Sequence, residues 1–322
     1  MTRTVLVTGM GGNVGQGIVR SIRAMGEAIR VVGTNTECVS GGNHLCDAFH
    51  VVPYAVAPDF LPVMRTICAQ EAVELVIPST DYETYHLGVG QAHLPPVAVS
   101  PPSTSKIFLD KLETARFFAE QGIPFAETAE PRTYHGQFDK LIVKPREGRG
   151  SRNIHVDPPN PKDFSEEYLV QRRYEGAEIT TAFYVRRDRA IHGHVTMRRE
   201  LMHGMSFACE ITFVHDQAVD AVIRAMNAAL DIRGSCNVQS IITADGAVVP
   251  FEVNGRLSGT TSIRGQLGFN DVRWTIDEYL FGRAPASPRI IAGAAVRIML
   301  DVIYPGASLN DIADPAAEHF LY

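Results

Sequence analysis

The first 100 residues alternate apolar strand segments with amphipathic helical segments. Strands are expected at "TVLVTG", "IRVVGTN" and "VELVIPST", with a short last strand at "PVAVS", and helices at about 14–25, 59–70 and 82–92. Parallel strands need a crossover connection, usually a helix, so this alternation predicts a parallel sheet with helices on its faces. The prolines around "PVAVS" then predict a domain boundary near residue 100.

The rest of the chain has a different pattern. The stretch "STSKIFLDKLETARFFAEQGIP" predicts one helix that ends at Gly122 and Pro124. Short strands and loops follow up to about residue 174, and then longer strands form hairpins that turn at Asp188 and at Asp245–Gly246. A helix at 216–232 separates the hairpins. We therefore expect an α/β part followed by an α+β part, divided into residues 1–100, 101–175 and 176–322.

Composition excludes several classes of protein. The net charge is −6 over 322 residues, without a basic stripe, so nucleic acid is not an expected partner. No apolar run reaches the about 20 residues that span a bilayer, so no membrane association is expected. The five cysteines include no C-x-x-C pair. This pattern favours reduced thiols and a cytoplasmic location.

The glycine turn in "VTGMGGNVGQGIVRSI" also fits the pattern of nicotinamide-dependent short-chain dehydrogenases. Such enzymes place an acid at the end of the second strand, where this chain has Asn35, although Glu37 is close. They also need a tyrosine followed by a lysine four residues later, and none of the ten tyrosines has one. We interpret the turn as a marker of the fold, with an NAD(P)-dependent oxidoreductase as the alternative function.

The residues that carry chemistry lie in the second half. "DKLIVKPREGRGSRN" places Lys144 at the end of an apolar strand, before a loop that contains Gly148, Gly150 and Ser151. A lysine there can neutralise phosphate while loop amides bind its oxygens. The last hairpin would present Gln239, Glu252 and Asn254 together, and such oxygen donors suit Mg²⁺ that is also held by nucleotide phosphates.

Four segments together resemble the ATP-grasp superfamily, in the branch similar to the synthetase halves of carbamoyl-phosphate synthase. They are "DKLETARFFAEQGIP", "LIVKPREGRGS", "LVQRRYEGAE" and "GSCNVQ…FEVNGRLSGTTS". The resemblance covers about residues 100–280, and the preceding part resembles the pre-ATP-grasp domain. It implies a Rossmann-like N-terminal domain followed by a two-lobed ATP-grasp fold, with residues 126–174 as a closing lid.

The resemblance implies a role for each matching residue. The ATP phosphates would contact Lys111 and Lys144, with Arg116 in reserve for Lys111. The rest of the nucleotide site would comprise Gly150 and Ser151 in the closing loop, Gln171 with the backbone of Arg172 and Arg173 at adenine, Glu178 at the ribose, and His203. Magnesium, or manganese in its place, would be held by Gln239, Glu252 and Asn254. Arg256 would stabilise the transferred phosphoryl group.

Two positions depart from the family pattern. Gly255 stands where the family commonly has proline, which we expect to change little in the chemistry. Gly259 stands where carbamoyl-phosphate synthase has a further arginine, and this weakens the case for bicarbonate as a substrate.

The implied function is an ADP-forming ligase that activates a carboxylate as an acyl phosphate and joins it to an amine or ammonia. A kinase that stops at phosphoryl transfer and a non-catalytic nucleotide-binding module are alternatives. For the substrates themselves, Arg264 is a candidate for the acid, against an equal alternative in which it anchors its loop to a helix. Thr80 and Asp81, after a strand of the first domain, are further candidates for substrate binding, with Asp81 as the candidate for the amine. A homodimer is left open.

Overall fold

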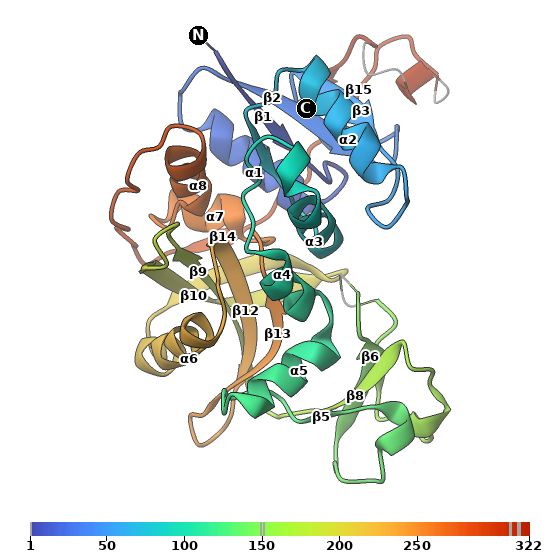
Figure 1. Cartoon of the computed structure of the whole chain (residues 1–322), viewed down its shortest axis with the longest axis vertical. Coiled ribbons are helices and arrows are strands. Elements are labelled where there is room, and N and C mark those ends of the chain that lie inside the picture. Colours follow the sequence, from blue (N-terminus) through green and yellow to red (C-terminus); the bar gives the residue numbers. More distant parts are fainter. Residues whose placement is uncertain (1, 149, 151, 309–310, 314–316) are drawn as a thin grey trace.

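A computed structural model describes residues 2–148, 150, 152–308, 311–313 and 317–322. Its N-terminal sheet is parallel, in the order β3-β2-β1-β4 (Figure 1). The strands are β1 Arg3–Val7, β2 Ile29–Asn35, β3 Ala48–Val51 and β4 Leu75–Ile77, and the helices are α1 Asn13–Arg23, α2 Phe60–Gln70 and α3 Asp81–Val89. The expected α/β part is confirmed. "PVAVS" contributes only a single bridge, between Val97 and Val76.

Alternation along β1 explains how both faces of this sheet are covered. Successive strand residues point to opposite faces. Val5 and Val7 belong to a core with α1 and α8 (Asp271–Tyr279), whereas Leu6 belongs to a core with α2. The C-terminal half of the chain therefore supplies one of the helices that complete the N-terminal core.

The helix expected over "STSKIFLDKLETARFFAEQGIP" is two helices, α4 Pro102–Leu109 and α5 Lys111–Glu120. The break lies at Asp110, whose backbone is extended. Its carboxylate accepts hydrogen bonds from the backbone N–H of Leu112, at 2.9 Å, and of Glu113, at 3.3 Å. The same carboxylate binds the guanidinium of Arg146 at 2.5 Å. A continuous helix was the wrong expectation, because an aspartate at a helix start competes with helical continuation.

A small antiparallel sheet follows, in the order β5-β8-β6-β7. Its strands are β5 Thr128–Ala129, β6 Leu141–Pro145, β7 His155–Val156 and β8 Tyr168–Arg172. Figure 1 shows this lid sheet, in green, projecting from the rest of the molecule. It has its own core of Tyr134, Phe138, Leu141, Val143 and Val170.

The large antiparallel sheet has the order β13-β12-β9-β10-β11-β14. Its strands are β9 Ala177–Val185, β10 Ile191–Met202, β11 Met205–Thr212, β12 Gly234–Ile242, β13 Val248–Asn254 and β14 Ala294–Val296. The hairpins turn where expected: Arg186 N donates to Ala190 O at 2.9 Å, and Thr243 N to Ala247 O at 3.0 Å. The mixed fold class predicted from the sequence is confirmed.

Helices cover both faces of the large sheet. One face packs against α6 (Asp216–Ala229) together with Phe108 of α4 and Phe118 of α5. The other face packs against Phe269 and Trp274, which follow α7 (Thr261–Gln266). Because Trp274 of α8 contacts this sheet while Val272 and Ile276 contact the N-terminal sheet, α8 joins the two.

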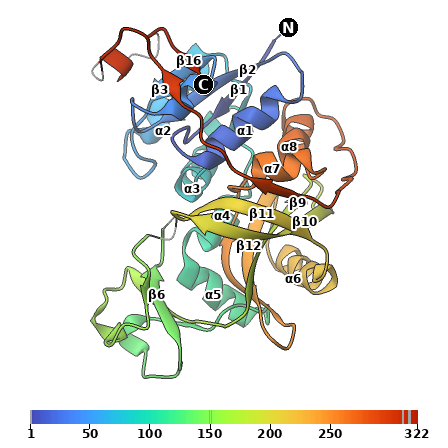
Figure 2. The ribbon, with the colours of Figure 1, turned by 180° about the vertical axis from the view of Figure 1, so that it is seen from behind.

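The chain ends in a two-stranded sheet, β15 Val302–Ile303 with β16 Phe320–Leu321, and Figure 2 shows it beside the N-terminal sheet. Short 3-10 helices lie at Gly41–Leu45, Gln91–His93, Pro131–Thr133, Pro161–Asp163 and Asp311–Ala313. Among the described residues, no helix has both the length and the apolar character needed to cross a membrane. The division at residues 100 and 175 stays a prediction.

The double role of Asp110 can be tested by two substitutions. Asp110→Ala removes the cap and the ion pair with Arg146, so we expect it to lower the free energy of unfolding by about 2 kcal/mol. Asp110→Asn keeps a capping oxygen and should lower it by about half as much. Thermal unfolding of both variants measures the difference. Equal melting temperatures for Asp110→Ala and the native chain would contradict this account.

Candidate functional site

The predicted metal ligands lie together on the β12–β13 hairpin. Gln239 and Glu252 are paired across the two strands, and Asn254 lies two residues beyond Glu252 on the same face. The Oε1 atom of Glu252 accepts hydrogen bonds from Gln239 Nε2, at 3.3 Å, and from Asn254 Nδ2, at 3.0 Å. Two amide side chains thus converge on one carboxylate.

Two lysines from other elements reach the same place. Lys144 is the penultimate residue of β6 in the lid sheet, and its Nζ donates to the backbone oxygen of Phe251 at 3.2 Å. Lys111 is the first residue of α5, and its Nζ donates to Gly148 O at 3.1 Å. Only 4% of Lys144 and 7% of Lys111 is exposed to solvent, which is unusual for lysine.

The charges in this cluster shift each other's pKa values. Burial lowers the pKa of Lys144 to about 8; the positive charge of Lys111 contributes, whereas Glu252 and Glu178 oppose the shift. Burial acts to raise the pKa of Glu252, but Lys111 and Lys144 outweigh it, so that this pKa lies below its usual value. The carboxylate is therefore ionised at neutral pH.

Arg256 connects the hairpin to the N-terminal sheet. Its Nη2 donates to Asn254 Oδ1 and to Asp81 Oδ2, both at 2.7 Å, and its Nε donates to Asp81 Oδ2 at 3.0 Å. Asp81, the candidate for binding the amine, therefore lies in the cluster as the partner of Arg256. The hydroxyl of Thr80 instead caps α3, accepting from Glu83 N at 3.2 Å and donating to Glu83 Oε2 at 2.7 Å.

Arg199, on β10, is a member of the cluster to which the sequence analysis assigned no role. Its Nη2 donates to Glu178 Oε1 at 2.7 Å and to Gln239 Oε1 at 2.5 Å. Strand alternation could have revealed it, since Arg199 falls on the same face as the buried Val195 and Met197. Glu178, expected at the ribose, is thereby joined to the proposed metal ligands.

The residues expected at adenine form hydrogen bonds with neighbouring residues of the lid. Gln171 is buried, and its Nε2 donates to the Thr128 hydroxyl at 3.1 Å. The backbone N–H of Arg172 donates to Glu127 O at 2.8 Å, and that of Arg173 to Lys140 O at 2.9 Å. These two N–H groups already donate hydrogen bonds to backbone oxygens of the protein. Their contacts with adenine stay a prediction.

The glycine loop after β6 meets the turn between β10 and β11. His203 and Gly204 form that turn, both with positive φ, at 51° and 76°. A Cβ atom on Gly204 would lie 2.5 Å from the carbonyl oxygen of Gly150, so the two backbones are in close contact. Gly150 therefore lies beside the turn that contains His203, and the contacts of both residues with a nucleotide stay a prediction. Ser151 lies outside the described residues.

Two of the arginines expected in the site, Arg116 and Arg264, lie outside the cluster around Glu252. Arg116 is on the exposed side of α5, paired with Glu113 and Glu130, so Lys111 is the better candidate for phosphate.

Arg264 is completely buried and bonds Asp271 Oδ2 at 2.5 Å. It also donates to the hydroxyls of Ser258, at 2.7 Å, and Thr260, at 2.8 Å. This is the alternative in which Arg264 anchors its loop to a helix, and we leave it out of the proposed site.

The opening glycine turn has a packing role. A Cβ on Gly15 would lie 2.9 Å from Thr8 O and 2.8 Å from Gly9 O, so α1 can approach β1 only with glycine there. Asn35, where a dehydrogenase has its acid, donates from Nδ2 to Asn43 Oδ1 at 3.1 Å. Its Oδ1 accepts from Thr36 N at 2.9 Å. Both observations support the interpretation of the turn as a marker of the fold.

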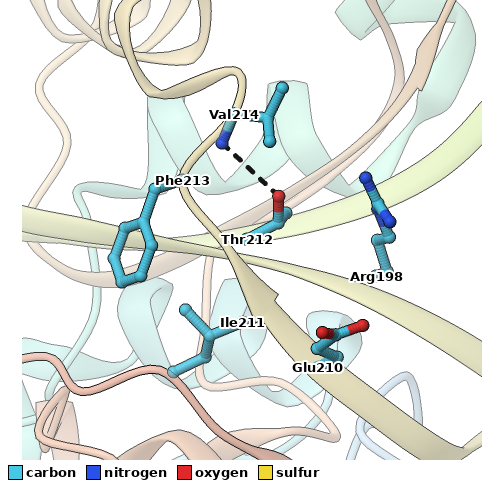
Figure 3. Close-up of a pocket in the computed structure, with 6 residues that line it drawn as sticks. All are labelled: Arg198, Glu210, Ile211, Thr212, Phe213 and Val214. Atoms are coloured by element: carbon cyan, nitrogen blue, oxygen red, sulfur yellow. Dashed lines mark hydrogen bonds between the residues drawn. The ribbon is translucent and has the colours of Figure 1, made fainter.

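A hollow of about 480 Å³ lies on the large sheet, lined by Arg198, Glu210, Ile211, Thr212, Phe213 and Val214 (Figure 3). Arg198 precedes Arg199 in the strand and so points to the opposite face. The hollow is open, since 49% of Phe213 and 73% of Val214 is exposed. We do not assign it to the polar cluster around Glu252, from which the sheet separates Arg198.

Comparisons with known proteins identify a domain and a similar fold. Residues 108–260 match the family model described as an ATP-grasp domain. N5-carboxyaminoimidazole synthetase from Staphylococcus aureus, solved with ADP, has a TM-score of 0.76 at 11% identity over 93% of this chain and 83% of its own. The L-amino acid ligase from Bacillus licheniformis has a TM-score of 0.69 at 12% identity over 90% and 75%.

Biotin carboxylase from Campylobacter jejuni is also similar, with a TM-score of 0.68 at 12% identity over 90% of this chain and 74% of its own. No curated protein sequence gives a significant match. At these identities, the structural similarity establishes the fold alone. The finer resemblance to the carbamoyl-phosphate synthase halves remains an interpretation of the motifs.

The anchoring role of Arg264 predicts the effect of Arg264→Lys. Lysine keeps the charge but cannot make the forked contacts to Asp271, Ser258 and Thr260, so we expect a loss of about 2 kcal/mol in the free energy of unfolding. Affinities for small ligands should change little. Thermal unfolding measures the effect, and Arg273→Lys on the more exposed part of α8 is the control. An unchanged melting temperature with weakened substrate binding would return Arg264 to the site.

Proposed function

Because the chain carries an ATP-grasp domain, we propose that it is an ATP-dependent ligase that activates a carboxylate as an acyl phosphate. An amine or ammonia then takes the acyl group, and ADP and phosphate are released. The observation that carries this proposal is the convergence of Lys111, Lys144 and Arg256 around the carboxylate and amides of the β12–β13 hairpin. Such a set of cations suits a nucleotide whose phosphates gain charge during transfer.

The donor set around Glu252 fits a magnesium ion. Glu252 supplies one carboxylate, and Gln239 and Asn254 supply amide oxygens. In this structure those oxygens accept from Arg199 and Arg256 while the amide N–H₂ groups face Glu252. To bind an ion beside Glu252, both amides would rotate and release the arginines. Within the described residues, no group of three or more His, Cys, Asp or Glu side chains could hold a metal ion. Phosphate oxygens and water would therefore complete the coordination of a magnesium ion bound at Glu252.

The proposed reaction has two displacement steps. A substrate carboxylate oxygen attacks the γ-phosphorus of ATP, and the bond to the β,γ-bridging oxygen breaks to release ADP. Lys111, Lys144 and Arg256 would stabilise the negative charge that accumulates on the transferred group, and a bound Mg²⁺ would neutralise further phosphate charge. The amine nitrogen then attacks the acyl carbon, phosphate leaves, and the amine loses a proton.

The lid sheet would protect the acyl phosphate from water. Lys144 is carried by this sheet yet contacts Phe251 of the large sheet, so closure of the lid would also bring the charge of Lys144 to the site. The contact between Gly150 and Gly204 lies at the same junction. Exclusion of water by such a lid prevents hydrolysis of the intermediate.

Three other functions are weaker candidates. A nicotinamide oxidoreductase would need the acid that Asn35 replaces and a Tyr–Lys pair that the sequence lacks. A non-catalytic module would have no use for the lysine, glutamate and arginine that converge here. A kinase would stop after the first step, and an assay for amide formation separates it from a ligase.

The metal assignment predicts that Glu252→Gln abolishes turnover. It removes the single anionic ligand of the proposed ion, so we expect a loss of at least about a thousandfold in kcat at saturating Mg²⁺. The assay is release of ADP and phosphate with pooled carboxylates and amines. Glu210→Gln, on the opposite face of the same sheet, should be unaffected. Release of AMP and pyrophosphate, or full activity of Glu252→Gln, would contradict the proposal.

The lowered pKa of Lys144 predicts a pH dependence of nucleotide affinity. Below its pKa of about 8 the amine is charged and attracts phosphate, whereas above it the free protein must take up a proton on binding. Affinity for ADP should therefore fall by up to about tenfold per pH unit above pH 8. Calorimetric titration between pH 7 and 9.5 measures this. In Lys144→Arg, which stays charged, the decrease should disappear, and an equal decrease in both proteins would show that another group titrates.

A further inference from the structure

Two arginines lie on either side of Glu252 in matching arrangements. On one side, Arg256 donates from Nε, at 3.0 Å, and from Nη2, at 2.7 Å, to a single oxygen of Asp81. On the other side, Arg199 donates from Nε, at 3.1 Å, and from Nη2, at 2.7 Å, to a single oxygen of Glu178. Each guanidinium is therefore held in place by a carboxylate from another element of the fold.

The match extends to the amides beside Glu252. The Nη2 atom of Arg256 also donates to Asn254 Oδ1, at 2.7 Å, and that of Arg199 to Gln239 Oε1, at 2.5 Å. Both amides in turn donate to one atom, the Oε1 of Glu252. Each arginine is thus separated by a single amide from the carboxylate that is proposed to hold magnesium. Only 13% of the side chain of Arg199 and 12% of that of Arg256 is exposed.

An ion bound at Glu252 would change what each arginine contacts. It would take the amide oxygens of Gln239 and Asn254, to which the arginines now donate. Glu178 and Asp81 would still hold the two guanidinium groups, so each Nη2 would keep its position and lose one acceptor. A nearly buried donor is costly to leave without an acceptor. Phosphate oxygens on the same ion would lie beside it and could accept the hydrogen bond.

We propose that Arg199 is a second arginine for the nucleotide phosphates, which becomes available to them when Gln239 turns to the metal. This rests on the proposed function, which gives Arg256 the equivalent role on the Asn254 side. Glu178 is then a positioning residue for Arg199, which differs from the ribose contact that the resemblance implies. A guanidinium suits this double use, because it can bind a carboxylate through two nitrogens and still donate to a phosphate.

Binding of a non-reacting nucleotide with and without magnesium tests this role. The probe is β,γ-methylene-ATP, titrated by calorimetry into the native protein and into Arg199→Gln. With Mg²⁺ we expect the variant to bind at least about tenfold more weakly, because a charged hydrogen bond to phosphate is lost. Without Mg²⁺, Gln239 keeps the hydrogen bond from Arg199 in the native protein, so the two affinities should agree within about threefold.

Arg198→Gln is the matched control. Arg198 directly precedes Arg199 on β10, is exposed, and points to the opposite face of the sheet. Its substitution should leave the affinity unchanged with and without Mg²⁺. Should Arg199→Gln fail to fold, Arg199→Lys decides, because lysine keeps the charge without the fork. We expect a loss of about threefold in that variant, again only with Mg²⁺.

Four results would overturn the role. Tighter binding of the magnesium complex by Arg199→Gln would show that Arg199 only competes with the ion for Gln239. An equal loss with and without Mg²⁺ would show a structural effect, and no loss in either condition would remove Arg199 from the site. Adenosine has the ribose but no phosphate, so its affinity should be unchanged in Arg199→Gln. A matching loss for adenosine would place the effect at the ribose, through Glu178.

The ligase proposal can fail independently of this one. If no pair of acid and amine yields ADP, while Arg199→Gln still shows the magnesium-dependent loss of nucleotide binding, the ligase is rejected and Arg199 stays at the phosphates. If ADP is released with acid and amine, while Arg199→Gln binds the magnesium complex as tightly as the native protein, the ligase is kept and the role of Arg199 is rejected.

Discussion

The ionised carboxylate of Glu252 is the group around which the rest of the site is arranged. It is balanced by Lys111 and Lys144, which come from α5 and β6, and it accepts hydrogen bonds from two amides on its own hairpin. Lysines this deeply buried would be unfavourable without such a partner. The start of α5 and the end of β6 are thereby both held at the hairpin, and the Asp110–Arg146 ion pair ties these two elements to each other.

A second constraint holds the two large parts of the chain together. The helix α8 presents Val272 and Ile276 to the N-terminal sheet and Trp274 to the large sheet, so neither core is complete without it. The buried pair of Arg264 and Asp271 fixes the loop after β13 to the start of this helix. Arg256 then bonds Asp81 at the edge of the N-terminal sheet. The end of the β12–β13 hairpin is therefore fixed both to the N-terminal part of the chain and to α8.

Much of this arrangement is predictable from periodicity. The strands β1, β2 and β4, the two hairpins and the convergence of Gln239, Glu252 and Asn254 follow from alternation and from turn residues. The short strand β3 was not predicted, and "PVAVS" forms a single bridge in place of the expected strand. The break at Asp110 was missed because the helical pattern of apolar residues continues through it, and only the capping hydrogen bonds and Arg146 reveal it.

The arginines show most clearly which features of the site the sequence pattern does not predict. Arg264 is close to Arg256 in sequence yet is buried away from the cluster, whereas Arg199 is distant in sequence from Gln239 yet donates to its Oε1 atom. Distance along the chain cannot distinguish these cases, because they depend on how β10 and α8 pack.

The central claim is that the carboxylate of Glu252 binds magnesium together with nucleotide phosphates. The most direct measurement is the affinity for ADP with and without Mg²⁺, in the native protein and in Glu252→Gln. The account predicts that Mg²⁺ strengthens ADP binding to the native protein by at least about tenfold. In Glu252→Gln the magnesium effect should vanish, while ADP alone binds no more weakly. The same strengthening by Mg²⁺ in both proteins would contradict the account.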